Sequence, residues 1–538
     1  MRNSYDVVVV GSGFGGAITG CRLAQAGRSV SILERGRRWD KSEFPRSPAE
    51  VSKSFWKKGE SFGFLEYKAF RRVDVIQGCG VGGGSLHYFN VHLRTPDAIF
   101  AGGAWPPEIS RATLDPYYDL AESVLESAPL SPPAGRGLPR RTEAFVAAVA
   151  ATGHKADLVP IGVYTGVDRL NPHGKRPQTA CDYSGNCLLG CDLHAKNTLD
   201  LNYLAVAERN GAEIFPLHQA GKIEPLGDQG YRVHYEGFDA ADPGRSERGS
   251  VIGRKVILAA GTLGTNELLL GSRDLHRTLP NLSARLGHGF SVNGDFLLAG
   301  TLDADRIVDP GRGPSITAGA DFSTGNNQIF IEDLGFPDSF MWLLEGIIPN
   351  SNHFANLLRA AGTYLLNMTG FGKGRVDFEV NRLFRGGATT RLLPYLGMGT
   401  DAADGRLKLS GGEIEIEWNH RKSRRMFNEL ESALQALSRG LGGKYETGIL
   451  WRWPLRKLLT AHPLGGCRMA TSKSSGVLNH RGEVWDYPNL YVADGSMIPS
   501  ALSVNPSLTI SALAERVAFW IINEREMQKG DRDAPHTA

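Results

Sequence analysis

The chain has 538 residues, of which 41% are hydrophobic, 22% charged and 9% aromatic, so it can bury a large core and is neither disordered nor a disulfide-stapled scaffold. Lysine plus arginine number 60 and aspartate plus glutamate 57, and the resulting net charge of +3 gives no reason to expect a nucleic-acid partner. The 66 glycines show no collagen-like period, which favours tight turns and loops that approach a ligand closely.

The cellular location is predicted from what the chain does not contain. Six cysteines are too few for the disulfide framework of a secreted protein of this length. The strand-like run at 5–10 leads directly into a glycine turn that belongs to the fold, so we expect no signal peptide. An uninterrupted apolar run of 18 residues, as a transmembrane helix needs, is also absent. We therefore expect a cytoplasmic protein.

The first predicted element is a buried strand at 7–10, which is followed by the glycine pattern GSGFGG and by apolar residues at helical spacing. A second strand, 29–33, is followed directly by an acid, Glu34. This is the dinucleotide-binding βαβ unit, in which the glycines let the backbone approach a pyrophosphate and the acid accepts hydrogen bonds from a ribose. The acid disfavours NADP, but the pattern does not separate NAD from FAD. The residues of this unit that we predict to bind the cofactor are Gly11, Gly13, Phe14, Gly15, Gly16, Glu34 and Arg35.

A second glycine-rich segment, 78–85, has too many glycines for a helix interior or a strand. It predicts a loop whose backbone amides face a ligand. The alternative, a flexible linker, is disfavoured by Val81 and Leu86, which are apolar anchors on either side of the last glycines.

The remaining pattern predicts a return to the nucleotide domain, then a second domain of sheet plus helices from about 300 to 450. In chain order, the predicted elements are a helix at 115–125, an exposed loop at 129–138, a helix at 197–210, strands at 213–217, 230–235 and 251–260, a helix at 266–270, a strand at 328–331, a helix at 354–366, a strand at 413–418, a helix at 423–437, a strand at 490–493, a helix from 506 to about 523 and a disordered tail at 529–538.

Two features near the C-terminus carry chemistry. His462 begins the sequence HPLGGC, which predicts a rigid turn. Asn505 and Pro506 open the last helix, with the asparagine as N-cap and the proline at the first helical position. The positive end of that helix suits an anionic ring such as reduced flavin. The alternative is that the histidine only fixes a turn and the asparagine only caps a helix.

Together these segments resemble the glucose-methanol-choline (GMC) oxidoreductase family, and within it the cholesterol-oxidase-like branch. The pairing of His462 with Asn505 is similar to the sterol-oxidising members, since many other members have a second histidine at the asparagine position. The matching segments run from near the start of the chain to near its end, so the resemblance covers essentially the whole chain. They are 11–16 with Glu34, 82–85, 256–262, 462–467, 489–496 and 504–506 with 514–516.

The resemblance implies an α/β fold with FAD as the cofactor. A discontinuous Rossmann-like FAD-binding domain (1–44, 196–300 and 460–538) would be joined to a substrate domain of mixed β-sheet plus helices (45–195 and 301–459). The substrate domain would contribute a flavin-contacting loop, 78–90. The further cofactor-binding residues that the resemblance implies are Gly78, Gly82, Gly83, Gly84, Ser85, Tyr88, Asn90, Gly261, Asp494, Gly495, Asn505 and Pro506.

The implied activity is oxidation of a bulky apolar alcohol by hydride transfer to flavin N5, with His462 and Asn505 as the catalytic residues. An imidazole can accept or orient the hydroxyl proton, and an amide can hydrogen-bond the substrate oxygen or the flavin edge. Oxygen or another acceptor would take the electrons. The alternative is a lyase, decarboxylase or isomerase on the same fold. An NAD(P)H-dependent flavin reductase is disfavoured, because the sequence has no second strand-GxGxxG-helix unit.

A carboxylate that moves a steroid proton in sterol oxidases would come from a loop near 389–396. This chain has no acid between Glu379 and Asp401. Coupled steroid isomerisation is therefore not expected unless Glu332 or Glu345 supplies the acid from elsewhere.

The sequence leaves more than one interpretation for two further segments. Cys181, Cys187 and Cys191 have a poor spacing for a tetrahedral site, so we predict no metal and interpret them as a redox pair or as small buried thiols. The apolar stretch 339–370 is interpreted as a core helix pair, with a hydrophobic substrate pocket or a lid that touches a membrane transiently as the alternative.

Overall fold

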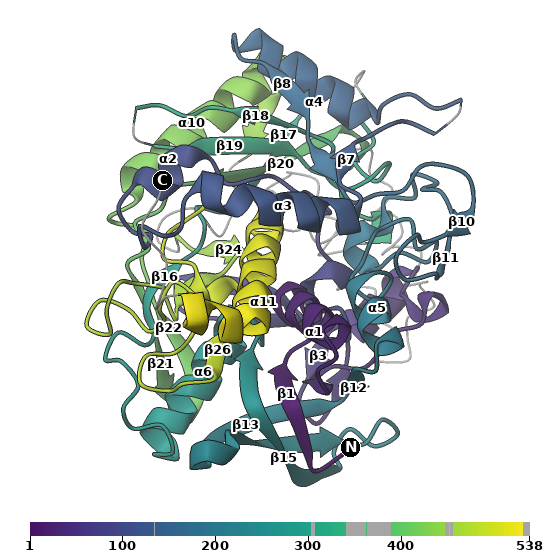
Figure 1. Ribbon diagram of the computed structural model, residues 1–538. Helices are drawn as coiled ribbons and strands as arrows, with labels where there is room; N and C mark the ends of the chain where they lie inside the picture. The colour runs from purple at the N-terminus through teal and green to yellow at the C-terminus, as the bar shows by residue number, and fades with distance from the viewer. Residues whose placement is uncertain are drawn as a thin grey trace.

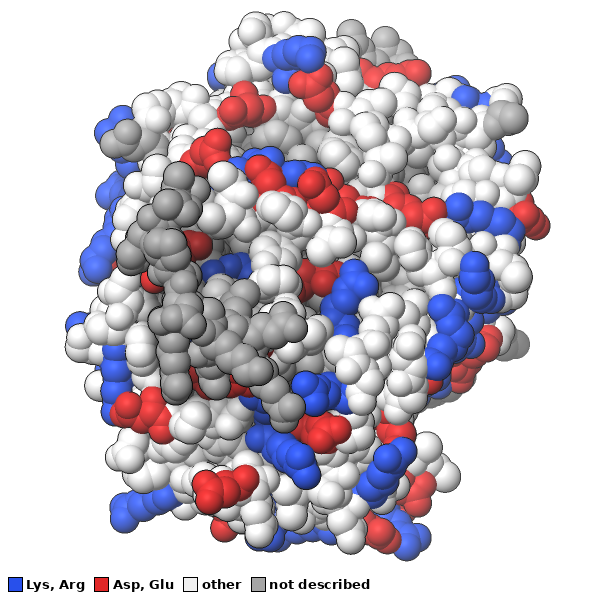
Figure 2. Space-filling model, viewed as in Figure 1, with Lys and Arg blue, Asp and Glu red and all other residues white. Residues whose placement is uncertain are grey.

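The computed structural model describes residues 1–133, 135–302, 307–325, 327–339, 362, 389–446, 451 and 456–530. Among these residues, no helix combines the length and the apolar character needed to cross a lipid bilayer. The predicted helix at 354–366 lies outside the described residues, apart from residue 362. On the face shown in Figure 2, basic and acidic side chains are interspersed.

A seven-stranded sheet forms the lower part of the molecule in Figure 1. Its central strand β1 is fully buried from residue 7 to residue 10 and pairs in parallel with β2 and β15, while β13, β14 and β15 form an antiparallel meander. The strands are β1 (Ser4–Val10), β2 (Val30–Leu33), β12 (Glu213–Phe215), β13 (His218–Pro225), β14 (Tyr231–Phe238), β15 (Ser246–Leu258) and β26 (Leu490–Val492). The parallel strands, buried on both faces, follow the β-branched runs of the sequence.

Helices cover this sheet and connect it to the rest of the chain. α1 (Phe14–Gln25) packs against α5 (Tyr203–Arg209) and α11 (Ser507–Gly530), and α11 also packs against α3 (Arg111–Leu125). α6 (Gly261–Leu270) follows β15 directly. The predicted helix at 197–210 is too long, because the Asn202 side chain accepts the amide N–H of Tyr203 at 2.6 Å and the helix begins only there.

The end of the chain also differs from the prediction. The last helix continues to residue 530, so residues 529 and 530 are helical, although we predicted a disordered tail from 529 onwards; the rest of that tail lies outside the described residues.

A six-stranded antiparallel sheet forms the upper part of Figure 1, with α4 (Arg140–Ala151) and α10 (Arg424–Gly440) packed on it. α10 buries the apolar stripe that its sequence spacing predicts, from Met426 to Leu437. In sheet order, the strands are β23 (Lys444–Glu446), β17 (Phe296–Thr301), β20 (Leu392–Gly399), β19 (Ile329–Asp333), β18 (Ala318–Asp321) and β8 (Ala156–Leu158).

Smaller sheets connect the two large ones. One contains β22 (Glu413–Glu417), β21 (Gly405–Ser410), β16 (His288–Ser291) and β25 (Leu464–Gly466), and another contains β24 (Leu458–Thr460), β6 (Val73–Gly78) and β5 (Leu65–Ala69). Other short elements are α2 (Asp97–Ala101) and the strand pairs β3 (Trp56–Lys57) with β4 (Ser61–Phe62), β7 (Ala128–Pro129) with β9 (Pro160–Ile161), and β10 (Arg169–Leu170) with β11 (Pro177–Gln178). The segment between β24 and β25 holds His462.

Candidate active site

A cavity of about 830 Å³ extends from the ends of β1 and β15 to the six-stranded sheet. Four predicted site residues, Gly16, Gly82, Ser85 and Asn90, are not part of its lining. The predicted site residues that it brings together are Gly11, Gly13, Phe14, Gly15, Glu34, Arg35, Gly78, Gly83, Gly84, Tyr88, Gly261, His462, Asp494, Gly495, Asn505 and Pro506.

The first glycine loop leaves room for a pyrophosphate. A Cβ on Gly11 or Gly15 would overlap a carbonyl oxygen of the neighbouring strand ends, so both positions require glycine. A Cβ on Gly13 would meet only the Cα of Gly83 at 3.9 Å, so this glycine borders open space. Gly13 is also the N-cap of α1 and has no side chain to satisfy the first amides. These free amides and the positive helix end fit the pyrophosphate of a dinucleotide.

Glu34 joins three segments at the cavity edge. Its Oε2 accepts the backbone N–H and the hydroxyl of Ser12 at 3.0 and 2.7 Å, and its Oε1 accepts the amides of Gly36 and Gly80 at 2.9 and 3.2 Å. The sequence prediction assigned this acid to a ribose and missed Ser12. The neighbouring Arg35 pairs with Glu66 at 2.5 Å.

The second glycine segment, 78–85, is held in place by hydrogen bonds of Gly82 and Ser85, which do not line the cavity. Gly82 has a φ of 110° and donates its amide to the Ser12 hydroxyl at 3.1 Å. The Ser85 hydroxyl donates to the Gly82 carbonyl at 2.7 Å and accepts the amide of Leu199 at 3.1 Å. Gly83, at a φ of 53°, approaches Gly13 so closely that a Cβ on it would lie 2.5 Å from the Gly13 Cα. The two predicted glycine loops therefore meet, and the hydrogen bond from Gly82 to Ser12 joins them.

Two further residues of this segment carry side chains that sequence reasoning did not resolve. Asn90 is fully buried with a φ of 69°, and neither end of its amide has a hydrogen-bond partner among the described residues. His87, which was not predicted, lines the cavity. Burial lowers the pKa of His87 to about 3, and the nearby charges of Lys196 and His462 act in the same direction. The imidazole of His87 is therefore neutral.

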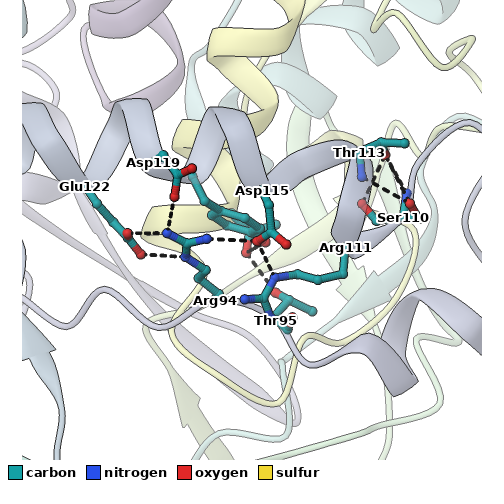
Figure 3. A network of polar contacts seen from close by, with 10 residues as sticks. Arg94, Thr95, Ser110, Arg111, Thr113, Asp115, Asp119 and Glu122 are labelled. Carbon is teal, nitrogen blue, oxygen red and sulfur yellow. Dashed lines mark hydrogen bonds and ion pairs between the residues drawn. The ribbon is translucent and has the colours of Figure 1, made fainter.

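The chain after this loop is anchored by a charged network (Figure 3). Arg94 pairs with Asp115 at 2.8 Å, with Asp119 at 2.6 Å and with Glu122, all on α3. Arg111 pairs with Asp115 at 2.7 Å.

The same region is linked to α11 by hydroxyl groups. Thr509, in the first turn of α11, lies 2.8 Å from the hydroxyls of both Thr95 and Tyr118. α3 thus holds this chain segment and the start of α11 together.

His462 is held by a carboxylate that was not predicted. Its Nδ1 lies 2.8 Å from Oδ1 of Asp295, whose side chain is only 2% exposed. Oδ2 of Asp295 accepts the hydroxyl of Thr460 at 2.8 Å and the amides of Ala461 and His462 at 3.0 and 3.2 Å. With Nδ1 as the donor to this acid, Nε2 carries the lone pair. A signal for Asp295 was present in the sequence, an acid directly before a buried strand, but its partner is 167 positions away.

Asn505 does not cap the last helix, so that prediction is wrong. α11 begins at Ser507 and its first α-helical hydrogen bond runs from Ile510 to the Pro506 carbonyl at 2.9 Å. The Asn505 amide points elsewhere: Nδ2 donates to Oε2 of Glu332 at 3.2 Å. Glu332 is fully buried in β19, and burial raises its pKa well above the ordinary value.

The loop at 389–396 contains no acid, but an acid, Glu332, lies on the strand that is paired with it. Residues 389–391 form a short 3-10 helix and residues 392–396 lie in β20, where Leu396 is paired with Glu332. Of the two acids that the sequence left open, Glu332 lies beside Asn505 and Glu345 lies outside the described residues.

Asp494 lies at the end of β26, beside the start of α6. Its Oδ2 accepts the amide of Gly261 at 3.0 Å and the hydroxyl of Thr265 at 2.5 Å, and its Oδ1 accepts the amide of Ser496 at 2.9 Å. Burial raises the pKa of Asp494, although these hydrogen bonds act against the rise. The acid thus joins two loops of the cavity wall.

The cavity that His462 and Asn505 line also has apolar side chains in its wall. They come from the loop after residue 88, from the short 3-10 helix Asn186–Leu189, and from the six-stranded sheet and the residues after β19: Phe89, Val91, Leu188, Leu297, Leu334, Phe336 and Leu396. The stretch at 339–370, which we considered for this role, lies outside the described residues except for residues 339 and 362.

The cysteines are all free thiols. Burial raises the pKa of Cys181 and of Cys191, which keeps both in the thiol form. Within the described ranges, no group of three or more histidine, cysteine, aspartate or glutamate side chains is arranged to hold a metal ion.

Comparisons with known proteins agree with this arrangement. A family model described as GMC oxidoreductase matches residues 5–274, and a second matches residues 401–514. A cholesterol oxidase from Acinetobacter baumannii is 31% identical over 96% of this chain and 94% of its own length. The long-chain-alcohol oxidase FAO4B from Arabidopsis thaliana is 25% identical over 97% of this chain and 68% of its own length.

The fold is also found in solved structures. Pyridoxine 4-oxidase from Mesorbium loti superposes with a TM-score of 0.60 and 18% identity, over 96% of this chain and 98% of that one. The relatives named here are oxidases, so they lend no support to the lyase, decarboxylase or isomerase alternative.

Proposed function

Because this chain belongs to the GMC oxidoreductase family and is an FAD-dependent enzyme acting on CH–OH groups, we propose that it oxidises a bulky apolar alcohol to the carbonyl compound, with His462 and Asn505 at the hydroxyl group. The observation that carries this proposal is the His462–Asp295 pair in the wall of a cavity that is also lined by apolar side chains. FAD, when bound, supplies the acceptor for the carbinol hydride at its N5 atom.

His462 removes the hydroxyl proton in this proposal. Asp295 receives the Nδ1–H group, so the free lone pair is on Nε2, where it can accept a proton from the substrate. The carboxylate also stabilises the imidazolium that forms, because an opposite charge lies 2.8 Å away. Asp295 acts as a positioning residue, because it acts through the His462 ring.

Asn505 stabilises negative charge on the substrate oxygen or on the flavin edge. Its amide cannot titrate, but it lies two residues before the start of α11, where the positive helix end adds to its effect. The residues proposed to hold FAD are the glycine loop at the start of α1 with Glu34, the loop that includes Gly83 and Gly84, and Asp494.

The substrate class follows from the apolar wall. Phe89, Leu297, Phe336 and Leu396 offer no hydrogen bonds to the hydroxyl groups of a sugar and would leave them unsatisfied. A sterol or a long-chain alcohol, which carries one hydroxyl on an apolar body, fits this surface. The names of the relatives, cholesterol oxidase and long-chain-alcohol oxidase, support this class and support oxygen as the electron acceptor.

The test is anaerobic reduction of the purified flavoprotein. Sterols and long-chain alcohols should bleach the flavin absorbance, while glucose, choline and methanol should do so with a kcat/KM at least about tenfold lower, which corresponds to ~1.4 kcal/mol. Admission of air should then restore the yellow colour if oxygen is the acceptor. A preference for a sugar, or a flavin that no alcohol reduces, would overturn the proposal.

A further inference from the structure

A second cavity, of about 1400 Å³, borders the cofactor cavity. The linings of the two cavities share Arg35, Trp56, Gln219 and Glu267. Away from these shared residues, the second cavity is lined by the turn between β5 and β6, the loop after β22, the start of α10 and Arg456. These parts do not line the cofactor cavity, so the proposed binding of FAD does not account for them.

Four arginines of this lining are gathered near His420. Arg72 comes from the turn between β5 and β6, Arg421 and Arg424 flank the first residue boundary of α10, and Arg456 precedes β24. Burial lowers the pKa of His420, and the positive charges of all four arginines lower it further. The ring is therefore neutral at pH 7, and the positive charge of this arginine cluster comes from the guanidinium groups.

Trp451 holds one member of the arginine cluster in place. Its indole ring is 3% exposed, and the guanidinium of Arg456 lies 5.1 Å from its centre. The ring of His420 packs edge-on against the same indole at 5.3 Å. The stacking positions the charge of Arg456 without neutralising it, because the indole ring has no net charge. Among the described residues, Arg456 has no acidic partner.

The sequence around the start of α10 concentrates cations where a helix disfavours them. The positive end of the helix dipole favours acids in the first turn, and this first turn has none. The side chain of the N-cap residue, Ser423, makes no capping hydrogen bond, and its hydroxyl accepts the amide of Ala402 at 2.9 Å. The cations beside Ser423 are Arg421, Lys422, Arg424 and Arg425.

These four cations divide into two pairs. Lys422 and Arg425 do not line the second cavity and form ion pairs, at 3.2 Å with Asp404 and at 2.8 Å with Glu429. Arg421 and Arg424 line the cavity, and neither has an acidic partner in the part of the chain that the structure describes. The unpaired cations are thus the two at the cavity.

The acids in the described lining of this cavity do not neutralise the arginine cluster. With the exception of Glu413, which lies at the opposite end of β22 from His420, each of them forms an ion pair with another cation. These pairs are Glu66 with Arg35 and Lys68, Glu267 with Lys68, and Glu415 and Glu417 with Lys408.

The chemistry of the cluster matches a phosphate group. Guanidinium groups have hydrogen-bond donors and no acceptor, keep their charge at neutral pH, and present parallel N–H groups that fit two phosphate oxygens. We propose that the second cavity binds the phosphate group of a small soluble molecule through Arg421, Arg424 and Arg456, with the positive end of α10 adding to the attraction. The enclosed shape of a cavity favours a small molecule over the surface of an anionic membrane. This inference is independent of the proposed alcohol substrate.

Titration calorimetry of the FAD-loaded protein with inorganic pyrophosphate tests the proposal, at a fixed ionic strength of about 0.15 M. The loaded cofactor keeps the titrant away from the glycine loop at the start of α1. We expect saturable binding with a Kd of about 1 mM or lower. A titration without saturation up to about tenfold that concentration would overturn the proposal.

Two double variants with the same loss of charge locate the site. Arg421→Gln combined with Arg424→Gln should raise the Kd for pyrophosphate by at least about tenfold, which corresponds to ~1.4 kcal/mol. Lys422→Gln combined with Arg425→Gln should change it by less than about threefold, because these cations lie outside the cavity lining. Equal losses in the two double variants would show a diffuse attraction and contradict the proposal.

A third variant guards against a disturbed helix start. Arg456→Gln lies outside α10 and should also raise the Kd by about tenfold, with circular dichroism as the check that all variants fold. An unchanged Kd in folded Arg456→Gln would remove this residue from the site and contradict the proposal as stated.

Vesicles distinguish a soluble phosphate from a lipid headgroup. Cosedimentation with phosphatidylcholine vesicles, with and without phosphatidic acid, should show no binding that pyrophosphate fails to match in the calorimeter. Binding to the phosphatidic acid vesicles together with no binding of pyrophosphate would identify an anionic membrane surface as the occupant, and would contradict the proposal.

Discussion

Asp295 holds His462 at two points, since one carboxylate oxygen lies 2.8 Å from Nδ1 of the imidazole and the other accepts the backbone amide of the same residue at 3.2 Å. Ring and backbone are thus fixed by one side chain, which comes from the chain segment before β17. This arrangement orients the imidazole and fixes its tautomer before any substrate arrives.

Replacement of Asp295 tests this role. Asp295→Asn keeps an oxygen for the Nδ1–H group but removes the charge, so we expect the rate constant for flavin reduction to fall by about 10- to 100-fold with FAD retained. Asp295→Ala should be slower still, because the ring loses its orientation as well. Stopped-flow reduction by one alcohol measures both variants. Equal rates in wild type and Asp295→Ala would show that the pair is only structural.

The cofactor loop gives a second prediction. Gly13→Val should fold, because a Cβ there meets only the Gly83 Cα at 3.9 Å, but it should lose FAD because the side chain enters the pyrophosphate space. Gly137→Ala, at a position with nothing within 4 Å of the added Cβ and outside the cavity lining, is the matched control and should keep FAD. Flavin absorbance per protein, with circular dichroism as the check on folding, measures the result. A folded Gly13→Val protein with full flavin content would contradict the assignment.

Two buried histidines predict how stability depends on pH. Burial lowers the pKa of His87 and of His92 to about 3, whereas an unfolded chain protonates histidine near ~6.5. The unfolded state therefore binds more protons between these values, and the free energy of unfolding falls as the pH drops below about 6.5, by at most ~1.4 kcal/mol per pH unit for each histidine. Above about pH 6.5 these histidines do not change the free energy of unfolding with pH.

Urea unfolding between pH 5 and pH 8 measures this slope. His87→Gln should make the slope shallower on the acid side, and replacement of the exposed His276 by glutamine should leave it unchanged. An identical acid slope in the wild type and His87→Gln would show that His87 does not become protonated on unfolding as we expect.

The Arg94 network gives a prediction for the stability of the chain segment that follows the second glycine loop. Arg94→Leu leaves Asp115, Asp119 and Glu122 facing one another without their shared cation, so we expect a loss of about 1 to 3 kcal/mol in the free energy of unfolding. Arg425→Leu, which breaks an exposed pair with Glu429, is the control and should cost less than about 1 kcal/mol. Urea titration compares the two variants, and equal losses would show that the network does not anchor the segment.

Local patterns predicted much of the fold. The run of valines at 7–10, the glycines after it and the acid at 34 are close in sequence, and the strand–loop–helix unit that they form was confirmed. Helix ends were less accurate, because a single side chain decides them: Asn202 starts α5 later than the periodicity indicates, and the amide of Asn505 contacts another strand and does not cap α11.

The polar partners of the site could not be predicted. Asp295 and Glu332 are 167 and 173 positions away from His462 and Asn505, and only the packing of the six-stranded sheet beside the cofactor cavity brings them together. The apolar wall has the same origin, since its residues are scattered from Phe89 to Leu396. Sequence spacing carries no information about such contacts, because they depend on how the sheets are placed.

The central claim is that His462 and Asn505 act on one transition state, and stopped-flow reduction of two single variants and the double variant tests it most directly. His462→Ala should slow flavin reduction by roughly 10²- to 10⁴-fold with FAD bound, His462→Gln should be milder, and Asn505→Ala should slow reduction and lower the flavin potential. The losses in reduction rate from His462→Ala and Asn505→Ala, expressed as free energies, should be less than additive in the double variant. Near-wild-type reduction by His462→Ala with intact flavin would contradict the account.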